Sequence, residues 1–194
     1  QAGAALFAEK CAPCHGERGL GDGPQAANLS VPVAAIGLPE VSRMATPAAW
    51  FTLVTEGNLE RFMPPFRSLS DRQRWDIVAY TISLSDEAEN VALGEQLYQA
   101  NCTSCHGETG LGDGPEASTL DPRPASFADQ ASMAERSTES FYQSIVNGVG
   151  SMPAYGDQFS EEENRALAAY VRKLSFASTA TAAVNTPATE PGTA

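Results

Sequence analysis

The chain has 194 residues, a length that suits two domains of about 85 residues better than one small domain. Its formal net charge is −12, which makes nucleic acid and anionic lipid surfaces poor partners. No run of about 18 apolar residues occurs, so no segment of this sequence is predicted to span a membrane.

The first predicted element is an amphipathic helix over residues 3 to 14. It begins at Gly3 and places Leu6 and Phe7 one turn before Cys11. A glycine at the start of a helix usually marks a flexible end. Because the same glycine recurs in the second half of the chain, we expect another helix to approach closely here.

This helix runs into the sequence Cys11-Ala12-Pro13-Cys14-His15. The Cys-x-x-Cys-His pattern is typical of c-type haem attachment. Two thiols at this spacing can each bond one vinyl group of a single porphyrin, and the adjacent imidazole then lies under the iron as a ligand. A single Cys-x-x-Cys pair is equally common in redox dithiols and in zinc sites, which remain alternatives for one motif alone.

After the motif, the chain is predicted to be irregular as far as the next helix. Gly19 to Pro24 contains three glycines and ends in proline, which favours a tight loop. Leu29 to Pro47 is rich in Pro, Ala and Ser, so we expect it to wrap around the edge of the haem without long helices. Helical periodicity returns over residues 47 to 56, and Gly57 is expected to end that helix.

Met63 follows in the sequence Arg61-Phe62-Met63-Pro64-Pro65-Phe66, 48 residues after His15. Methionine sulfur is the soft ligand that this chain can offer as a sixth ligand to iron. The following prolines prevent the loop from forming a helix and can hold the sulfur in place. Met44 is the alternative in this half, but loop packing is the simpler interpretation for it.

The last helix of the first half is marked by Ser70 and Gln73, which form a capping-box pattern. Its apolar face is expected to pack on the first helix of the same half. Ser85 to Ala92 is polar and acidic, which indicates a connector. We therefore predict a first domain at 1–86 and a linker at 87–92.

The second half repeats the first. Residues 3 to 30 match residues 94 to 121 at fifteen of 28 positions, with a constant offset of 91. The repeat contains Cys102, Cys105 and His106, so the two motifs account for all four cysteines and both histidines. This repetition favours two haems over a zinc site or two dithiols. Because the chain has only these two histidines, neither iron can take a second histidine ligand.

The remaining elements of the second half have counterparts in the first. A helix is predicted over residues 138 to 147, and Met152-Pro153 follows 46 residues after His106. Met152 is therefore the predicted sixth ligand, with Met133 as the alternative. Ser160 and Glu163 form the second capping box. Gly94 and Gly148 are the counterparts of Gly3 and Gly57, and Phe141 and Tyr142 are those of Trp50 and Phe51.

The ends of the chain give two further expectations. The second domain is predicted at 93–176, and residues 177–194, rich in Ala, Thr and Pro, are predicted to be a disordered tail or linker. The sequence starts at Gln1 without a basic segment and apolar run, so we expect a mature form exported by a signal peptide that has been removed.

With these motifs, the chain resembles class I cytochrome c twice over, as far as about Phe176. The resemblance implies an all-α fold of two tandem domains, each with a few helices around one covalent haem c. The arrangement is similar to two-domain bacterial cytochromes that carry electrons in the periplasm, and the glycine-rich loop resembles that of cytochrome domains joined to membrane oxidoreductases. It also implies that the carbonyls of Pro24 and Pro115 accept a hydrogen bond from the proximal imidazoles.

Two His/Met-ligated haems predict a carrier that passes electrons one at a time between redox partners and has no catalytic residues. One alternative is a dihaem peroxidase or small-molecule dehydrogenase with one open iron, for which Glu60, Arg61 and Arg67 are the candidate acid–base groups near Met63. The other alternative is an electron-transfer domain of a larger membrane-associated complex, which the predicted tail favours.

Charge is distributed unevenly between the halves. Residues 1–87 carry seven basic and ten acidic groups, whereas residues 88–194 carry five and fourteen. A redox partner with a basic docking surface would be attracted mostly by the second half. The alternative is an acidic face that only keeps the protein in solution.

Overall fold

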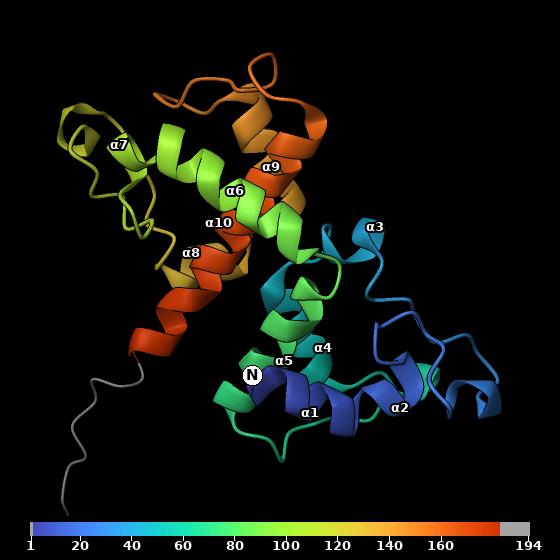
Figure 1. The fold of residues 1–194 in the computed structure, drawn as a ribbon. Helices are drawn as coiled ribbons and strands as arrows, with labels where there is room; N and C mark the ends of the chain where they lie inside the picture. Colours follow the sequence, from blue (N-terminus) through green and yellow to red (C-terminus); the bar gives the residue numbers. More distant parts are fainter. Residues whose placement is uncertain (1, 183–194) are drawn as a thin grey trace, which may run out of the picture.

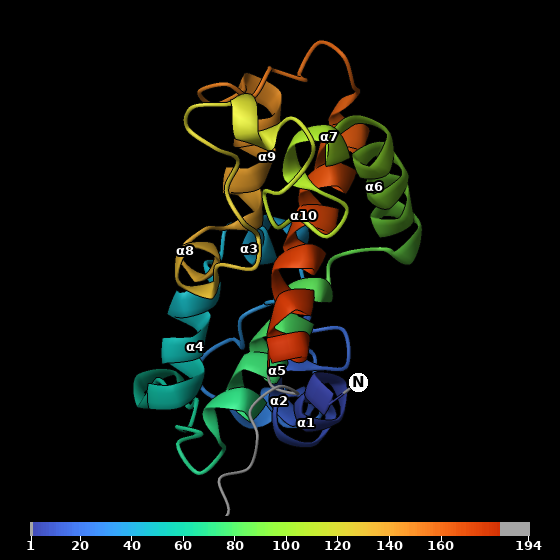
Figure 2. The same cartoon turned by 90° about the vertical axis from the view of Figure 1, so that its left-hand side faces the viewer.

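The structure is a computed structural model that describes residues 2–182. Its regular elements over these residues are all helical, which confirms the all-α prediction (Figures 1 and 2). In chain order they are α1 (Ala2–Lys10), α2 (Ala12–His15), η1 (Ala26–Asn28), α3 (Pro39–Ser42), α4 (Pro47–Glu56), η2 (Leu59–Arg61), α5 (Asp71–Ser83), α6 (Ala88–Asn101), α7 (Thr103–His106), η3 (Ala117–Thr119), α8 (Gln130–Ala134), α9 (Thr138–Asn147) and α10 (Glu161–Ala182).

Each half is built on one pair of packed helices. Helix α1 packs on α5, and α6 packs on α10, as the apolar faces predict. Figures 1 and 2 show α1 and α2 lying with α4 and α5, whereas α6, α7 and α9 surround α10. The same order of elements therefore occurs twice.

Glycine allows the two helix pairs to cross closely. A Cβ atom built on Gly3 would overlap the backbone carbonyl of Asp76 in α5. A Cβ on Gly94 would overlap the carbonyl of Ala166 in α10 in the same way. The prediction of a close helix approach at these two glycines is confirmed.

Both predicted capping boxes are present. The backbone N–H of Gln73 donates to Ser70 Oγ at 3.3 Å, and the Gln73 side chain accepts from the Ser70 N–H at 2.9 Å. In the second half, the N–H of Glu163 donates to Ser160 Oγ at 3.2 Å, and Glu163 Oε2 accepts from the Ser160 N–H at 2.8 Å. These bonds satisfy backbone groups that would otherwise lack partners at the starts of α5 and α10.

The structure corrects two predicted boundaries. Helix α6 begins at Ala88, so most of the predicted linker 87–92 is helical, and Val91 packs against the core of the second half. The polar residues that suggested a linker belong to a helix start, which composition alone does not distinguish. Helix α10 continues to Ala182, because alanine is a strong helix former, so residues 177–182 of the predicted tail are helical. The rest of that prediction, residues 183–194, lies outside the described residues.

The two halves contact each other. Phe176, in α10 of the second half, packs against the first-half cluster that contains Val54, Val78 and Ile82. The backbone N–H of Glu139 also donates to the carbonyl of Arg43 at 2.9 Å. A helix of one half thus completes an apolar cluster of the other.

Candidate functional sites

Each Cys-x-x-Cys-His motif lies where the first helix of its half bends. Helix α1 ends at Lys10, Cys11 lies between it and α2, and the N–H of Cys11 still donates to the carbonyl of Phe7 at 2.8 Å. The second motif has the same arrangement, in which the N–H of Cys102 donates to the Tyr98 carbonyl at 2.9 Å. The bend directs both thiols and the imidazole of each motif into one cavity.

The glycine-rich loops cover the backbone of the motifs. The N–H of Gly21 donates to the His15 carbonyl at 2.7 Å, and that of Gly23 donates to the Cys14 carbonyl at 3.1 Å. Gly21 has a φ of +78°, and a Cβ on Gly23 would overlap the carbonyls of the motif. The loop therefore needs glycine in order to lie against the motif, and the second half repeats its hydrogen bonds.

The first histidine has a defined tautomer. Its Nδ1 lies 3.1 Å from the carbonyl oxygen of Ala34, which can only accept a hydrogen bond. Nδ1 must therefore carry the proton, so Nε2 of His15 presents a lone pair, as a metal ligand requires. Burial also lowers the pKa of His15, which favours the neutral imidazole at pH 7.

This contact corrects the assigned roles of Pro24 and Pro115. The acceptor of the His15 hydrogen bond is Ala34, because the loop that ends at Pro24 folds against the motif backbone instead. In the second half, Nδ1 of His106 is buried without a hydrogen bond of standard geometry among the described residues. Burial lowers the pKa of His106, and the carbonyl of Ala125, the counterpart of Ala34, acts to raise it.

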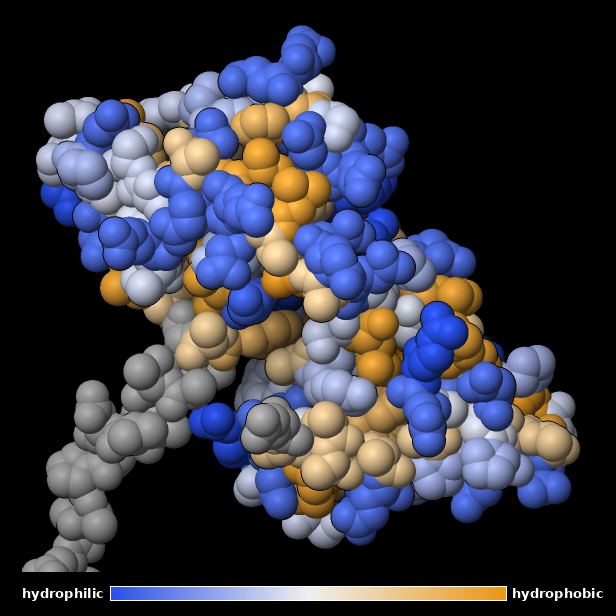
Figure 3. All heavy atoms as spheres, viewed as in Figure 1, coloured by the Kyte–Doolittle hydropathy of each residue, from blue (hydrophilic) through white to orange (hydrophobic). Residues whose placement is uncertain are grey.

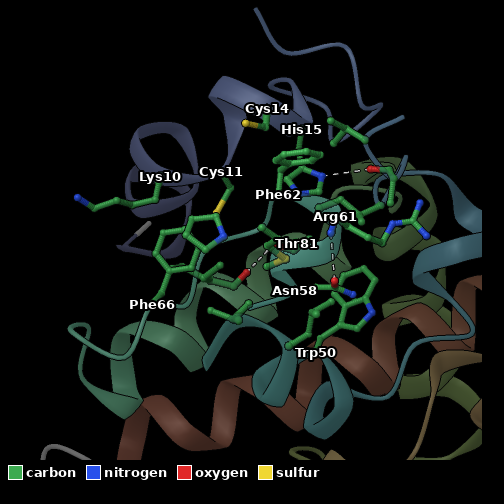
Figure 4. Close-up of a pocket in the computed structure, with 18 of the residues that line it drawn as sticks. Lys10, Cys11, Cys14, His15, Trp50, Asn58, Arg61, Phe62, Phe66 and Thr81 are labelled. Carbon is green, nitrogen blue, oxygen red and sulfur yellow. Dashed lines mark hydrogen bonds between the residues drawn. The ribbon is translucent and has the colours of Figure 1, made fainter. Parts of the chain in front are cut away.

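The first cavity brings together the predicted anchors and ligands of one haem. Cys11, Cys14 and His15 line it, and Met63 lies on its wall. Figure 4 shows Cys11, Cys14 and His15 together with Trp50, which reaches the cavity from α4. The remaining lining is mostly apolar, as a porphyrin ring requires, and includes Phe7, Leu29, Pro32, Val33, Ile36, Leu53, Val54, Phe62, Phe66, Ile77 and Val78.

A short backbone bridge holds Met63. Its N–H donates to the Asn58 carbonyl at 2.9 Å, and the N–H of Asn58 donates to the Met63 carbonyl at 2.8 Å. The Asn58 side chain also accepts from the N–H of Arg61 at 3.2 Å, a contact shown in Figure 4. Gly57, with a φ of +71°, ends α4 immediately before this bridge. Asn58 was not singled out from the sequence, although its position directly after the helix-ending glycine could have suggested a cap.

The second cavity has the same plan. Cys102, Cys105, His106 and Met152 line it. The N–H of Met152 donates to the carbonyl of Val149 at 2.9 Å, and the return bond measures 3.1 Å. The two predicted methionines therefore lie in the same kind of bridge, each in the cavity of its own motif.

The alternative methionines lie elsewhere. The Met44 side chain is 62% exposed, and Met133 is 1% exposed within the core of the second half. Neither lines a cavity that contains a cysteine motif. Of the three groups considered for acid–base chemistry near Met63, only Arg61 lines the first cavity; Glu60 and Arg67 do not.

Within the described residues, the cysteines of the two motifs do not belong to a zinc-type cluster of ligands. All four are free, and burial raises the pKa of Cys11 and of Cys102 to about 11. Zinc binds thiolates, which a raised pKa disfavours. Within residues 2–182, no group of three or more His, Cys, Asp and Glu side chains is placed to hold a metal ion.

The surface drawn in Figure 3 is largely polar, with apolar side chains gathered in smaller areas between polar ones. None of the helices in the described part of the chain has the length and apolar character needed to cross a membrane.

Known proteins match the chain along most of its length. The family model for cytochrome c oxidase, cbb3-type, subunit III matches residues 1–80 and 89–171. The cbb3-type cytochrome c oxidase subunit FixP of Azorhizobium caulinodans is 29% identical over 190 residues, which cover 89% of this chain and 58% of FixP. Chloroplastic cytochrome c6 of Chlamydomonas reinhardtii is 37% identical over 102 residues, covering 50% of this chain and 63% of that protein.

Subunit CcoP of the cbb3-type cytochrome c oxidase of Cereibacter sphaeroides is 27% identical over 194 residues, covering 89% of this chain and 60% of CcoP. The chain spans about three fifths of the length of these relatives. The double match agrees with the repeated motif and with the two cavities. The chain thus belongs to the family of cbb3-type cytochrome c oxidase subunit III, as a dihaem protein of two tandem c-type cytochrome domains with covalent haem c.

Proposed function

We propose that this protein carries electrons one at a time between redox partners through two six-coordinate haems. The observation that supports the proposal is that each cavity is lined by one set of the predicted anchors and ligands. In the first cavity the set is Cys11, Cys14, His15 and Met63; in the second it is Cys102, Cys105, His106 and Met152.

The residues of each set have distinct roles in this proposal. The two thiols would hold the porphyrin as thioethers, and the histidine Nε2 and the methionine sulfur would be the protein ligands of the iron. Haem c supplies one-electron exchange between ferric and ferrous iron, and an axial methionine favours the ferrous state and so raises the reduction potential. With both of these ligands bound, the iron would have no free position for a substrate.

Carbon monoxide binding tests this proposal against an enzyme with one open iron. The reduced native protein should not bind carbon monoxide rapidly, because His15 with Met63, and His106 with Met152, would already bind the two irons. Absorption spectra of the reduced protein before and after exposure to the gas provide the measurement. Rapid, stoichiometric binding at one haem would contradict the electron-carrier proposal and favour a peroxidase or dehydrogenase.

The family suggests that the carrier works in a larger redox assembly on the extracytoplasmic side of a membrane. FixP and CcoP, which this chain resembles over 89% of its length, are subunits of cbb3-type cytochrome c oxidases. The charge of −12 favours a partner with a basic docking surface.

Two measurements test the assembly and the basic partner. The full-length protein, extracted from its native membrane, should co-purify with other subunits of a cytochrome c oxidase. Its electron-transfer rate with that partner should fall as ionic strength rises, because salt screens charge attraction between exposed groups. A protein that purifies alone and reacts at a salt-independent rate would contradict both.

A further inference from the structure

The second cavity contains a cation that has no acidic partner among residues 2–182. Arg136 follows α8, lines the cavity and is half-buried. Its Nη2 donates to Ser144 Oγ at 2.9 Å, and its guanidinium carbon lies 5.0 Å from the centre of the Phe141 ring. These two contacts leave most of the five guanidinium N–H donors available.

A second guanidinium group, that of Arg172, lies beside Arg136, and the repulsion between the two positive charges destabilises the charged form of Arg136. Arg172 is 2% exposed and donates to the backbone carbonyl of Arg136. The pKa of Arg172 is lowered to about 9, mainly by burial and also by the charge of Arg136, while Asp86 acts to raise it. Burial also lowers the pKa of Arg136 itself. A partly buried cation next to another cation is stabilised only when an anion faces it.

We propose that Arg136 binds a propionate group of the haem in the second cavity. Haem c carries two carboxylates, and the planar guanidinium fork matches a carboxylate with two parallel hydrogen bonds. Ser144 and the ring of Phe141 hold the fork at the cavity wall. This inference rests on the proposed attachment of the second haem to Cys102, Cys105 and His106.

The first half lacks this arrangement and so provides an internal comparison. At the offset of 91 residues, Ala45 replaces Arg136 and Leu53 replaces Ser144. Arg136 and Ser144 therefore have no counterparts of their own type in the first half, where the cations that line the cavity are Lys10 and Arg61. We expect a propionate–arginine pair that a serine and a phenylalanine ring hold in this way at the second haem and not at the first.

The potentials of the two haems test the pairing. In the dihaem protein, Arg136→Gln should lower the reduction potential of the second haem, because loss of a nearby cation favours the ferric state. That potential should also become more dependent on pH between 5 and 8. Without the positive charge of Arg136, the pKa of the propionate rises, so the propionate takes up a proton within this range. The first haem should keep its potential. Potentiometric titrations followed by absorbance measure both haems, with the second assigned through the Met152→Ala variant.

Two further variants distinguish the proposed pairing with the propionate from a nonspecific effect of positive charge and from a loss of folding. Arg123→Gln removes an exposed charge from the wall of the same cavity and should shift the second potential less, because solvent screens it. Arg136→Lys keeps the charge without the planar fork, so the propionate bending mode in resonance Raman spectra should shift while the potential stays near the native value.

An unchanged second potential in Arg136→Gln would overturn the proposal, as would a larger shift in Arg123→Gln. If Arg136→Gln does not fold, an unshifted propionate mode in Arg136→Lys would overturn it. A native protein with fewer than two haems would instead contradict the proposed haem attachment.

Discussion

Replacing Met152 with alanine should abolish half of the weak absorption band near the red edge of the spectrum, which reports methionine sulfur on ferric iron. Met63→Ala should abolish the other half. Each cavity contains one methionine, held by a backbone bridge, so no second sulfur can take its place. Each variant should also bind carbon monoxide at one haem when reduced and should lower the potential of that haem.

The other two methionines supply the controls. Met44→Ala removes an exposed side chain, and Met133→Leu replaces a core side chain with one of similar volume. Both should leave the red-edge band intact. If Met44→Ala abolishes half of the band and Met63→Ala does not, the proposed ligand of the first haem is wrong.

Substituting Gly94 with alanine should destabilise the protein although alanine is the better helix former. Helix propensity alone predicts a gain of ~1 kcal/mol. The added Cβ, however, would overlap the backbone carbonyl of Ala166 and lie 3.0 Å from Tyr170 Cβ, and a backbone carbonyl cannot rotate away. Overpacking of this kind typically costs about 1–3 kcal/mol. Denaturant unfolding of the dihaem protein, followed by circular dichroism, measures the net change in the free energy of unfolding.

A reverse substitution in the same helix distinguishes crowding from helix propensity. Ala92 is exposed in α6, so Ala92→Gly should cost ~1 kcal/mol through propensity and nothing through packing. Gly3→Ala, at the matching crossing of α1 and α5, should destabilise as Gly94→Ala does. A gain in stability in either glycine variant would show that the helices can move apart at little cost.

Sequence reasoning worked where the signal was local and repeated. The capping boxes at Ser70 and Ser160 depend on residues three positions apart, and the structure forms both. Gly57 ends α4 as predicted, because its φ of +71° strains other residues. The two glycines at the helix crossings were found because the same residue recurred at a constant offset.

Sequence reasoning failed where the partner was distant in the chain. The acceptor for His15 is Ala34, nineteen residues away in an irregular segment, and no residue type marks a backbone carbonyl. The role given to Pro24 came from resemblance, whereas the carbonyl beside His15 Nδ1 in the structure is that of Ala34. Arg136 and Arg172 were also missed, because their pairing depends on how α8, α9 and α10 meet. The start of α6 and the end of α10 were predicted from composition to be a linker and a tail. Polar or alanine-rich sequence occurs in exposed parts of helices as well as in linkers, so composition does not distinguish the two.

The contact of Phe176 with the cluster around Val54 and Val78 bears on how the two metal centres communicate. Because a side chain of one half packs against the other, we expect this contact to restrict the rotation of the halves about the short segment that joins them. Packing should then set the separation of the two irons. Exchange of an electron between them should accordingly follow a single exponential and be insensitive to solvent viscosity.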